Sequence, residues 1–327
     1  MPDYAPLTAD TLACIASIPG LRLIDDPARR EDFGKDGTPG LRSLPEAVVE
    51  ATEVAAVQQL LCLANERSFP VTPRGLGTGL AGGAVPVRGG VVLSLARMNR
   101  IIAVEPRNLI AVVEPGVVNL DLKNAAAEHG LFYPPDPASL DTCSLGGNAA
   151  TNAGGPSCVK YGTTRDYILG LEAVLPTGEL LATGVRTRKG VVGYDLTRLL
   201  VGSEGTLGVI TKLILRLIPR PAAVTTLVAL FPELVPAMET IAMILRNGHV
   251  PSAMEFLDRR CLELVGDFLP FPGGQGAGAM LLLEADGDPE RIQREIEAIG
   301  EICLNGGAAE VLMAPDANRR NRMWAVR

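Results

Sequence analysis

Apolar and polar residues change their spacing from segment to segment, and this pattern predicts alternating strands and helices from residue 45 onward. Residues 47–51 and 90–95 are short apolar runs of the kind that forms buried strands. Between them, Thr52 can cap a predicted helix that runs to Arg67, in which apolar residues recur every three or four positions, and 69–72 is a further short strand. The first part of the chain is therefore expected to alternate between β and α structure.

From residue 101 to residue 218 the pattern predicts antiparallel hairpins. Short apolar runs there are joined by turns such as Pro176-Thr177-Gly178. Single helices are expected between these pairs. The predicted elements are, in order, a hairpin of Ile101–Glu105 and Ile110–Glu114, a helix over 119–129, an irregular segment over 133–165, a hairpin of Leu169–Leu175 and Glu179–Thr183, a short helix from Asp195, and a strand over Val209–Ile218.

Pro219-Arg220-Pro221 interrupts the pattern and marks a predicted domain boundary. Strands and helices alternate regularly beyond it, which predicts a ferredoxin-like α+β layer of helices on an antiparallel sheet. The strands are expected over 224–230, 252–257, 279–285 and 308–313, and the helices over 235–247, 259–269 and 289–305.

Three regions follow from this division. We expect an N-terminal arm at 1–42, a first domain at 43–221 and a second domain at 222–327. A last helix is predicted after Asp316, and the chain stops at Arg327 without a closing turn. We therefore expect the second domain to be truncated.

Composition narrows the classes of function. The chain has 327 residues, is 47% hydrophobic and carries a formal net charge of −7, which argues against a nucleic-acid partner. Any bound phosphate should be held by backbone amides rather than by a basic patch. The six cysteines form no CxxC motif, and the N-terminus lacks a secretory signal. No apolar run is long enough for a transmembrane segment, so we expect a reduced, cytoplasmic protein.

The sharpest motif is the glycine-rich loop Pro73-Arg74-Gly75-Leu76-Gly77-Thr78-Gly79-Leu80-Ala81-Gly82-Gly83. Glycines let a backbone approach a ligand closely, so that successive N–H groups can point at an anion. The loop formally fits GxGxxG, but the following Ala84-Val85-Pro86 cannot continue a helix, and no acidic residue follows about 20 positions later. A nicotinamide-dinucleotide site is therefore disfavoured. A glycine-rich hairpin without a ligand remains the alternative.

Two further segments are rich in glycine. One is 146–155, which also contains Asn and Thr and is expected to form a loop, and the other is 202–208, directly before the strand at 209. Three such segments within one domain indicate a long ligand that passes several loops. A dinucleotide has the required length.

These three segments, PRGLGTGLAGG, DPASLDTCSLGGNAATNAGG and GYDLTRLLVGSEGTLGVIT, resemble the FAD-binding domain of the vanillyl-alcohol oxidase/p-cresol methylhydroxylase superfamily. Within it, the chain is most similar to the branch of the bacterial glycolate oxidase D subunit and the D-lactate dehydrogenases. The resemblance implies a two-subdomain FAD-binding domain of this type, followed by an incomplete ferredoxin-like α+β cap domain. Some members attach flavin covalently through a His in the first loop. Thr78 occupies the matching position, so non-covalent FAD is expected.

The resemblance also assigns cofactor contacts to individual positions. The first loop is implied to wrap the pyrophosphate, the second segment to line the flavin and the third to meet the adenosine half. Cys143 could instead be a small core residue, and Glu204 a helix-capping acid. The implied cofactor-binding residues are Pro73, Arg74, Gly75, Leu76, Gly77, Thr78, Gly79, Leu80, Asp136, Ser139, Cys143, Ser144, Gly147, Asn148, Thr151, Asn152, Gly154, Gly155, Glu204, Gly205, Val209 and Ile210.

The reaction implied by the resemblance is oxidation of a small 2-hydroxy acid, such as glycolate or D-lactate, by hydride transfer to flavin N5. In this branch, an Arg that follows a Trp in the cap domain binds the substrate carboxylate. Met323-Trp324-Ala325-Val326-Arg327 fits that pattern and makes Arg327 the candidate. The general base and the divalent-metal ligands of the branch would lie beyond Arg327, so no metal site is assigned within this chain.

Two alternatives stay open. One is a different chemistry on the same fold, of the alkyl-glycerone-phosphate synthase type, whose members carry long N-terminal extensions. The other is a non-catalytic FAD-binding or assembly subunit. The glycolate oxidase resemblance also implies a partner subunit that carries iron–sulfur clusters, through which the protein could be peripheral to the inner membrane.

Overall fold

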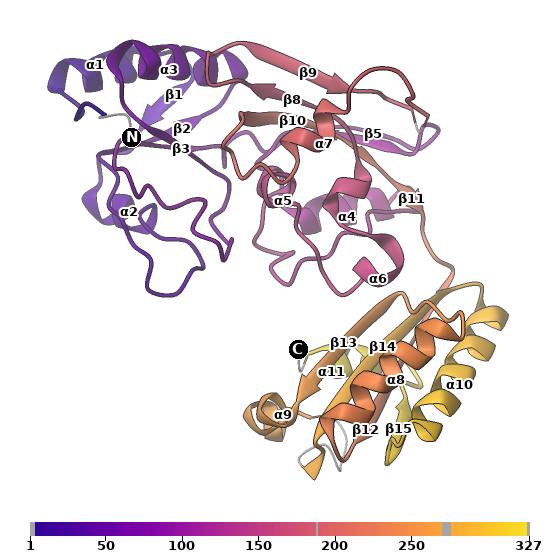
Figure 1. The fold of residues 1–327 in the computed structure, drawn as a ribbon. Helices are drawn as coiled ribbons and strands as arrows, with labels where there is room; N and C mark the ends of the chain where they lie inside the picture. Colours follow the sequence, from indigo (N-terminus) through magenta and orange to yellow (C-terminus); the bar gives the residue numbers. More distant parts are fainter. Residues whose placement is uncertain (1–3, 188, 270–275, 326–327) are drawn as a thin grey trace. The chain divides into compact units, whose positions relative to one another are not determined.

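The computed structural model describes residues 4–187, 189–269 and 276–325. The chain divides into two compact units, and each is considered by itself (Figure 1). The first unit comprises residues 1–154 and 163–219. The second comprises residues 155–162 and 220–327.

A four-stranded sheet organises the N-terminal part of the first unit. Its strand order is β1 (Leu21–Leu23), β2 (Ala47–Ala51), β4 (Val91–Ser94) and β3 (Val71–Arg74), with β2, β4 and β3 parallel. Helices α1 (Ala9–Ser17) and α3 (Val54–Arg67) pack on one face, and the short α2 (Pro27–Asp32) lies in the arm that leads to β2. The predicted strands and helix of this region are confirmed, although β3 starts two residues later than expected and the N-cap of α3 is Glu53 rather than Thr52.

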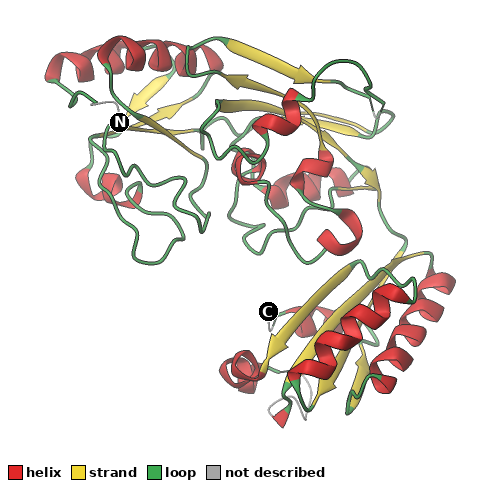
Figure 2. Ribbon diagram, viewed as in Figure 1, coloured by secondary structure: helices red, strands yellow, loops and turns green. Residues whose placement is uncertain are grey.

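The second sheet of this unit is antiparallel throughout, as the hairpin pattern predicts (Figure 2). Strand β10 lies at its centre and pairs with both hairpins, β5–β6 on one side and β8–β9 on the other. A two-stranded sheet, β7 (Leu131–Phe132) with β11 (Ile218–Pro219), accompanies it. The strands are β5 (Ile101–Glu105), β6 (Ile110–Val113), β10 (Val209–Arg216), β8 (Ile168–Val174) and β9 (Leu180–Gly184), and the helices α4 (Asn119–Ala127) and α7 (Leu196–Leu200).

The prediction of an irregular segment over 133–165 is wrong in part. This region contains helix α5 (Leu145–Thr151), helix α6 (Cys158–Tyr161) and a 3-10 turn at Thr164–Tyr167. Ser144 begins α5 as its N-cap, because its hydroxyl accepts a hydrogen bond from the Gly147 amide at 3.2 Å. Two glycines in seven residues disfavour a helix on propensity alone, so packing must offset that cost.

The second unit confirms the predicted ferredoxin-like layer. Its antiparallel sheet has the strand order β13 (Ala253–Asp258), β14 (Ala279–Gly287), β12 (Ala223–Phe231) and β15 (Glu310–Met313). Helices α8 (Leu234–Arg246) and α10 (Pro289–Asn305) cover one face (Figure 1). They bury alternate residues of β12 and β14 there. Helices α9 (Arg259–Val265) and α11 (Ala317–Trp324) pack on the other face.

Residues 155–162 precede β8 in the sequence but fold with the second unit. The ammonium of Lys160 and the hydroxyl of Tyr161 both donate to the carboxylate of Asp286 on β14. The Met254 amide also donates to the Pro156 carbonyl at 3.4 Å. The chain therefore enters the second unit twice, once through α6 and once after Pro219.

Candidate cofactor site

The loop that follows β3 is built to present backbone amides. In the described part of the chain, the N–H groups from Leu76 to Gly83 donate none of the protein's backbone hydrogen bonds. Gly77 and Gly82 have φ values of 73° and 75°, a conformation that side chains disfavour. A run of such amides can bind an anion without any side-chain charge.

Arg74 supports this loop from its buried side. Arg74 is 9% exposed, and its guanidinium donates to the carbonyls of Lys35 at 2.6 Å and Asp32 at 3.3 Å. It also lies 5.4 Å from the Phe33 ring. Burial lowers the pKa of Arg74, and Asp36 and Asp32 oppose that shift. The side chain of Arg74 is therefore committed to the N-terminal arm, and its backbone carbonyl accepts a hydrogen bond from the Leu95 amide at 2.9 Å.

The structure brings the first glycine segment against the second. A Cβ added at Gly75 would lie 2.2 Å from the Ser144 hydroxyl and 3.6 Å from the Gly147 nitrogen. In the same way, a Cβ at Gly146 would lie 2.4 Å from the Pro115 ring. These close approaches leave no room for a larger side chain at Gly75 or at Gly146.

The third segment joins the other two. The amides of Gly202 and Glu204 donate to the carbonyls of Ala149 and Ala150 in α5, at 3.0 and 2.9 Å. A Cβ at Gly205, which has a φ of 75°, would lie 2.7 Å from the Pro73 ring. All three glycine segments therefore converge on one region of the first unit.

A polar cluster lies around Cys143, directly before α5. The Asn148 amide donates to the Cys143 sulfur at 3.3 Å, and the Asn119 backbone donates to the Cys143 carbonyl at 3.1 Å. Among the described residues, the Asn119 side chain, the Tyr133 hydroxyl and Asn148 Oδ1 are buried without a hydrogen-bond partner. Most buried polar groups in native proteins are paired, so this cluster suits a polar ligand group or an ordered water.

Lys123 adds a cation beside the same cluster. Its ammonium donates to the carbonyl of Tyr133 at 2.6 Å, and burial lowers its pKa to about 8, opposed by Asp136 and Cys143. Burial also raises the pKa of the Cys143 thiol. Cys143 is 5% exposed, so the alternative of a small core residue fits its surroundings.

The sequence did not single out Lys123, Tyr133 or Asn119. Tyr133 had one signal, its place with two prolines directly before Asp136, whereas no signal along the chain pointed to Lys123 or Asn119. Asp136 and Ser139 themselves are half-buried in that same segment.

Several predicted residues serve the fold in ways that the motifs did not indicate. Asn152 ends α5 with a φ of 50°, and its side-chain oxygen accepts hydrogen bonds from Thr163 and Arg165. Glu204 lies in a left-handed turn after α7, and in the described part of the chain its side chain caps no helix, so the capping alternative is wrong. Gly155 belongs to the second unit.

Other predicted positions lie in the strand β10, in the helix α5 and at the end of the chain. Val209 and Ile210 are buried at the start of β10 and pair with Val174 and Ala173 of β8. Thr151 is exposed at the end of α5, where its hydroxyl donates to the Gly147 carbonyl at 3.0 Å. Arg327, the candidate for the substrate carboxylate, lies outside the described residues.

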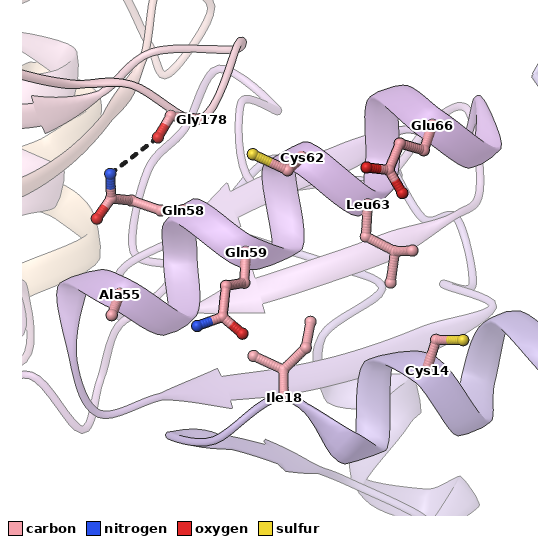
Figure 3. A pocket seen from close by; sticks show the side chains of 9 residues that line it. All are labelled: Cys14, Ile18, Ala55, Gln58, Gln59, Cys62, Leu63, Glu66 and Gly178. Carbon is pink, nitrogen blue, oxygen red and sulfur yellow. Dashed lines mark hydrogen bonds between the residues drawn. The ribbon is translucent and has the colours of Figure 1, made fainter.

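A surface hollow of about 440 Å³ is separate from these loops. It lies between α1 and α3, and Figure 3 shows the Gln58 amide donating to the Gly178 carbonyl at its edge. Apolar helix side chains line much of it. Among the described residues, none that lines the hollow belongs to the three glycine segments. Its lining includes Cys14, Ile18, Cys62, Leu63 and Glu66.

Comparison with known proteins identifies the family. Residues 45–184 match the FAD binding domain, and residues 220–327 match the C-terminal domain of FAD linked oxidases. The chain belongs to the FAD-linked oxidase family. FAD is therefore the cofactor of this domain, and the convergent amides and buried polar cluster fit such a ligand.

Curated relatives are similar over nearly the whole chain. The glycolate oxidase subunit GlcD of Bacillus subtilis is 41% identical over 309 residues, which cover 94% of this chain and 66% of that protein. The D-lactate dehydrogenase of Anaerostipes hadrus is 38% identical, covering 99% and 70%, and GlcD of Escherichia coli K12 is 37% identical, covering 98% and 64%. The chain therefore spans about two thirds of the length of these relatives.

Solved structures share the fold at low sequence identity. An alkyldihydroxyacetonephosphate synthase is 21% identical with a TM-score of 0.83, covering all of this chain and 66% of that one. A substrate-bound p-cresol methylhydroxylase is 20% identical with a TM-score of 0.80, covering 97% and 70%. The predicted superfamily and fold class are confirmed. No helix in the described residues has the length and hydrophobicity needed to cross a membrane.

Proposed function

We propose that this chain is the FAD-binding and cap portion of an enzyme that oxidises a small 2-hydroxy acid, of the glycolate or D-lactate type, to the 2-oxo acid. The convergence of the three glycine segments on one region supports the cofactor half of the proposal. The relatives named as glycolate oxidase subunit and D-lactate dehydrogenase support the substrate half.

Residues of the first unit would hold the cofactor without a covalent bond. The amides of the loop after β3 would bind the diphosphate, with Arg74 keeping the loop in shape through its carbonyl contacts. The segment from Asp136 to Asn148 would line the flavin, where Lys123 and the unpaired Asn148 oxygen offer polar contacts. When bound, FAD supplies the hydride acceptor for alcohol oxidation.

Substrate binding would depend on the second unit. We propose Arg327 as the bidentate partner of the substrate carboxylate, because it follows Trp324 in the family pattern. An arginine at this position would orient the hydroxyl-bearing carbon rather than take part in proton transfer. The general base is assigned to no residue of this chain.

An absorbance experiment tests the proposal. The whole protein that contains this chain, purified with FAD, should show flavin bands that glycolate or D-lactate bleaches under anaerobic conditions. L-lactate provides the stereochemical control, and comparing oxygen with an artificial dye as oxidant separates oxidase from dehydrogenase behaviour. Bound flavin that no 2-hydroxy acid bleaches would contradict the catalytic proposal. Failure to bind any FAD would contradict the cofactor site as well.

We also propose that the whole protein works with a partner subunit as electron acceptor. Two relatives are named as subunits of glycolate oxidase, which supports an assembly. The partner would supply iron–sulfur clusters as the electron acceptor for this protein. Co-purification of iron with the tagged chain from its own host tests this, and flavin-only preparations that retain full turnover with the native acceptor would contradict it.

A further inference from the structure

Arg165 lies where the second glycine segment of the first unit meets the third. Its backbone amide donates a hydrogen bond at 2.9 Å to the side-chain oxygen of Asn152, which ends helix α5. Its guanidinium donates through Nη2 to the carbonyl of Val201 at 3.0 Å, and Val201 directly precedes Gly202, the first residue of the third segment. One residue therefore contacts both the second segment and the start of the third.

The backbone around Arg165 is fixed to the second segment. Arg165 belongs to the 3-10 turn Thr164–Tyr167. The backbone amide and the hydroxyl of Thr164 both donate to the carbonyl of Ala153, at 3.1 and 2.8 Å. The side chain of Arg165 therefore extends from a fixed base beside α5 to the third segment.

The peptide group between Val201 and Gly202 is held at both of its polar atoms. Its carbonyl accepts from the Arg165 guanidinium, and its N–H donates to the carbonyl of Ala149 in α5 at 3.0 Å. Gly202 has a φ of 82°, and a Cβ added there would lie 2.9 Å from Nη2 of Arg165. Position 202 therefore requires glycine both for its backbone conformation and for the close approach of the guanidinium.

No acidic residue neutralises this guanidinium. Among the residues that the structure describes, no carboxylate lies within ion-pair distance of the half-buried Arg165, and its Nε is buried without a hydrogen-bond partner. Arg198, which is close to the third segment in the sequence, is instead exposed and pairs with Asp195 at 3.4 Å and Asp166 at 3.9 Å. Most buried polar groups in native proteins are paired, so the unpaired nitrogen of Arg165 needs an explanation other than packing.

We propose that Arg165 is a positioning residue for cofactor binding, which holds the peptide group between Val201 and Gly202 and so fixes the third glycine segment against α5. This inference rests on the proposed function, because it takes the three glycine segments to hold FAD and the third to meet its adenosine half. Arg165 lies outside all three segments in the sequence. It acts through the Val201 carbonyl rather than by touching the cofactor.

Binding of two fragments of the cofactor tests the proposal. The whole protein that contains this chain is stripped of FAD, and its affinities for FAD, ADP and FMN are measured by titration calorimetry. ADP carries the adenosine half of the cofactor, and FMN carries the flavin half. We expect Arg165→Met to weaken FAD and ADP binding by about tenfold or more, because the charge-assisted hydrogen bond to Val201 is lost, and FMN binding by less than about twofold.

Two further variants separate the hydrogen bond from a general loss of charge or stability. Arg165→Lys keeps a charged donor for the Val201 carbonyl and should stay within about threefold of wild type for all three ligands. Arg198→Met is the matched control, because it removes an exposed arginine of the same unit, and it should leave the three affinities unchanged. Equal losses in Arg165→Lys and Arg165→Met would overturn the hydrogen bond as the cause, as would equal losses in Arg165→Met and Arg198→Met.

Hydrogen exchange followed by mass spectrometry gives a second readout on the FAD-free protein. In Arg165→Met, the amides of residues 201–208 should exchange faster than in wild type, and those of the first glycine loop, 75–83, should exchange at the same rate. Unchanged exchange over 201–208 would overturn the proposal. Faster exchange throughout the unit, together with a lower thermal midpoint and equal losses for FAD, ADP and FMN, would also overturn it, because the role of Arg165 would then be structural.

This inference and the proposed function fail differently. A wild-type protein that binds neither FAD nor ADP refutes the cofactor site and the role of Arg165 with it. A wild-type protein that binds FAD equally well after Arg165→Met refutes the positioning role alone, and one that binds FAD but never ADP refutes the assignment of the adenosine half to the third segment. A protein that binds FAD but oxidises no 2-hydroxy acid refutes the proposed reaction, while the effect of Arg165→Met on FAD and ADP binding still supports the positioning role.

Discussion

Substitution of Gly75 by Ala tests whether the packing of the first glycine loop determines both protein stability and FAD affinity. An added Cβ would lie 2.2 Å from the Ser144 hydroxyl, which is far inside van der Waals contact. The serine hydroxyl also caps α5 through its 3.2 Å bond from the Gly147 amide. Relief of the overlap must therefore move either the loop or the cap.

The magnitude follows from these two contacts. Loss of an N-cap hydrogen bond costs about 0.5–2 kcal/mol, and overpacking in a well-packed site costs about 1–3 kcal/mol. Since relief follows one route or the other, we expect Gly75→Ala to destabilise the FAD-free protein by about 1–3 kcal/mol. A displaced loop should also lose at least one amide contact to the diphosphate, at about 1.5–3 kcal/mol, which lowers FAD affinity tenfold or more.

Gly79→Ala is the matched control in the same loop. A Cβ there would meet no atom within 4 Å, and its φ is not in the left-handed region. Its FAD-free stability should stay within about 0.5 kcal/mol of wild type, as for most surface substitutions. Thermal unfolding followed by circular dichroism gives the stabilities, and fluorescence titration with FAD gives the affinities. Equal destabilisation by both variants would refute the steric argument, and unchanged FAD affinity in both would refute the loop as the diphosphate site.

Three further outcomes are expected. Arg74→Lys keeps the charge but loses the forked contacts to backbone carbonyls. The free energy of unfolding should therefore fall by about 1–3 kcal/mol, seen as a lower thermal midpoint, and FAD affinity should fall with it. The pKa of Lys123 in the folded protein, about 8, lies below its ordinary value of 10.5. As pH rises between these values, the free energy of unfolding of the wild type should therefore increase by up to about 3 kcal/mol relative to Lys123→Met, as measured by denaturant unfolding. In maleimide labelling, the exposed Cys62 and Cys261 should react first, whereas Cys303, which is buried with a pKa of about 12, should react only on unfolding.

Much of the fold follows from local sequence signals. The helix predicted at 289–305 matches α10 at both ends, because Asp288 caps it and Pro289 occupies the first turn. The strand before the glycine loop was placed two residues too early, since apolar spacing marks the core of a short strand better than its ends. Elements with strong capping or long periodicity were therefore predictable.

Helix α5 shows where local reasoning stops. Its glycines argue against a helix, yet Gly146 is what lets Pro115 approach its backbone, and Gly75 lets the first loop do so. The Lys160 contact to Asp286 joins residues 126 apart in sequence, so no window along the chain could reveal it. The same holds for Arg165 and Val201. Each is ordinary by itself, and only the fold brings them together.

The acidic net charge of the chain is compatible with a diphosphate site because the proposed site does not use surface cations. Arg74, the one arginine in the first glycine loop, turns its guanidinium toward three backbone carbonyls in the described structure. The loop amides from Leu76 to Gly83 remain for the anion. Glycine then serves two purposes: it exposes these amides, and at Gly75 and Gly205 it lets three distant segments pack closely enough to form one surface. The motif is thus a packing requirement as much as a binding one, which explains why a GxGxxG match alone was a poor guide to it.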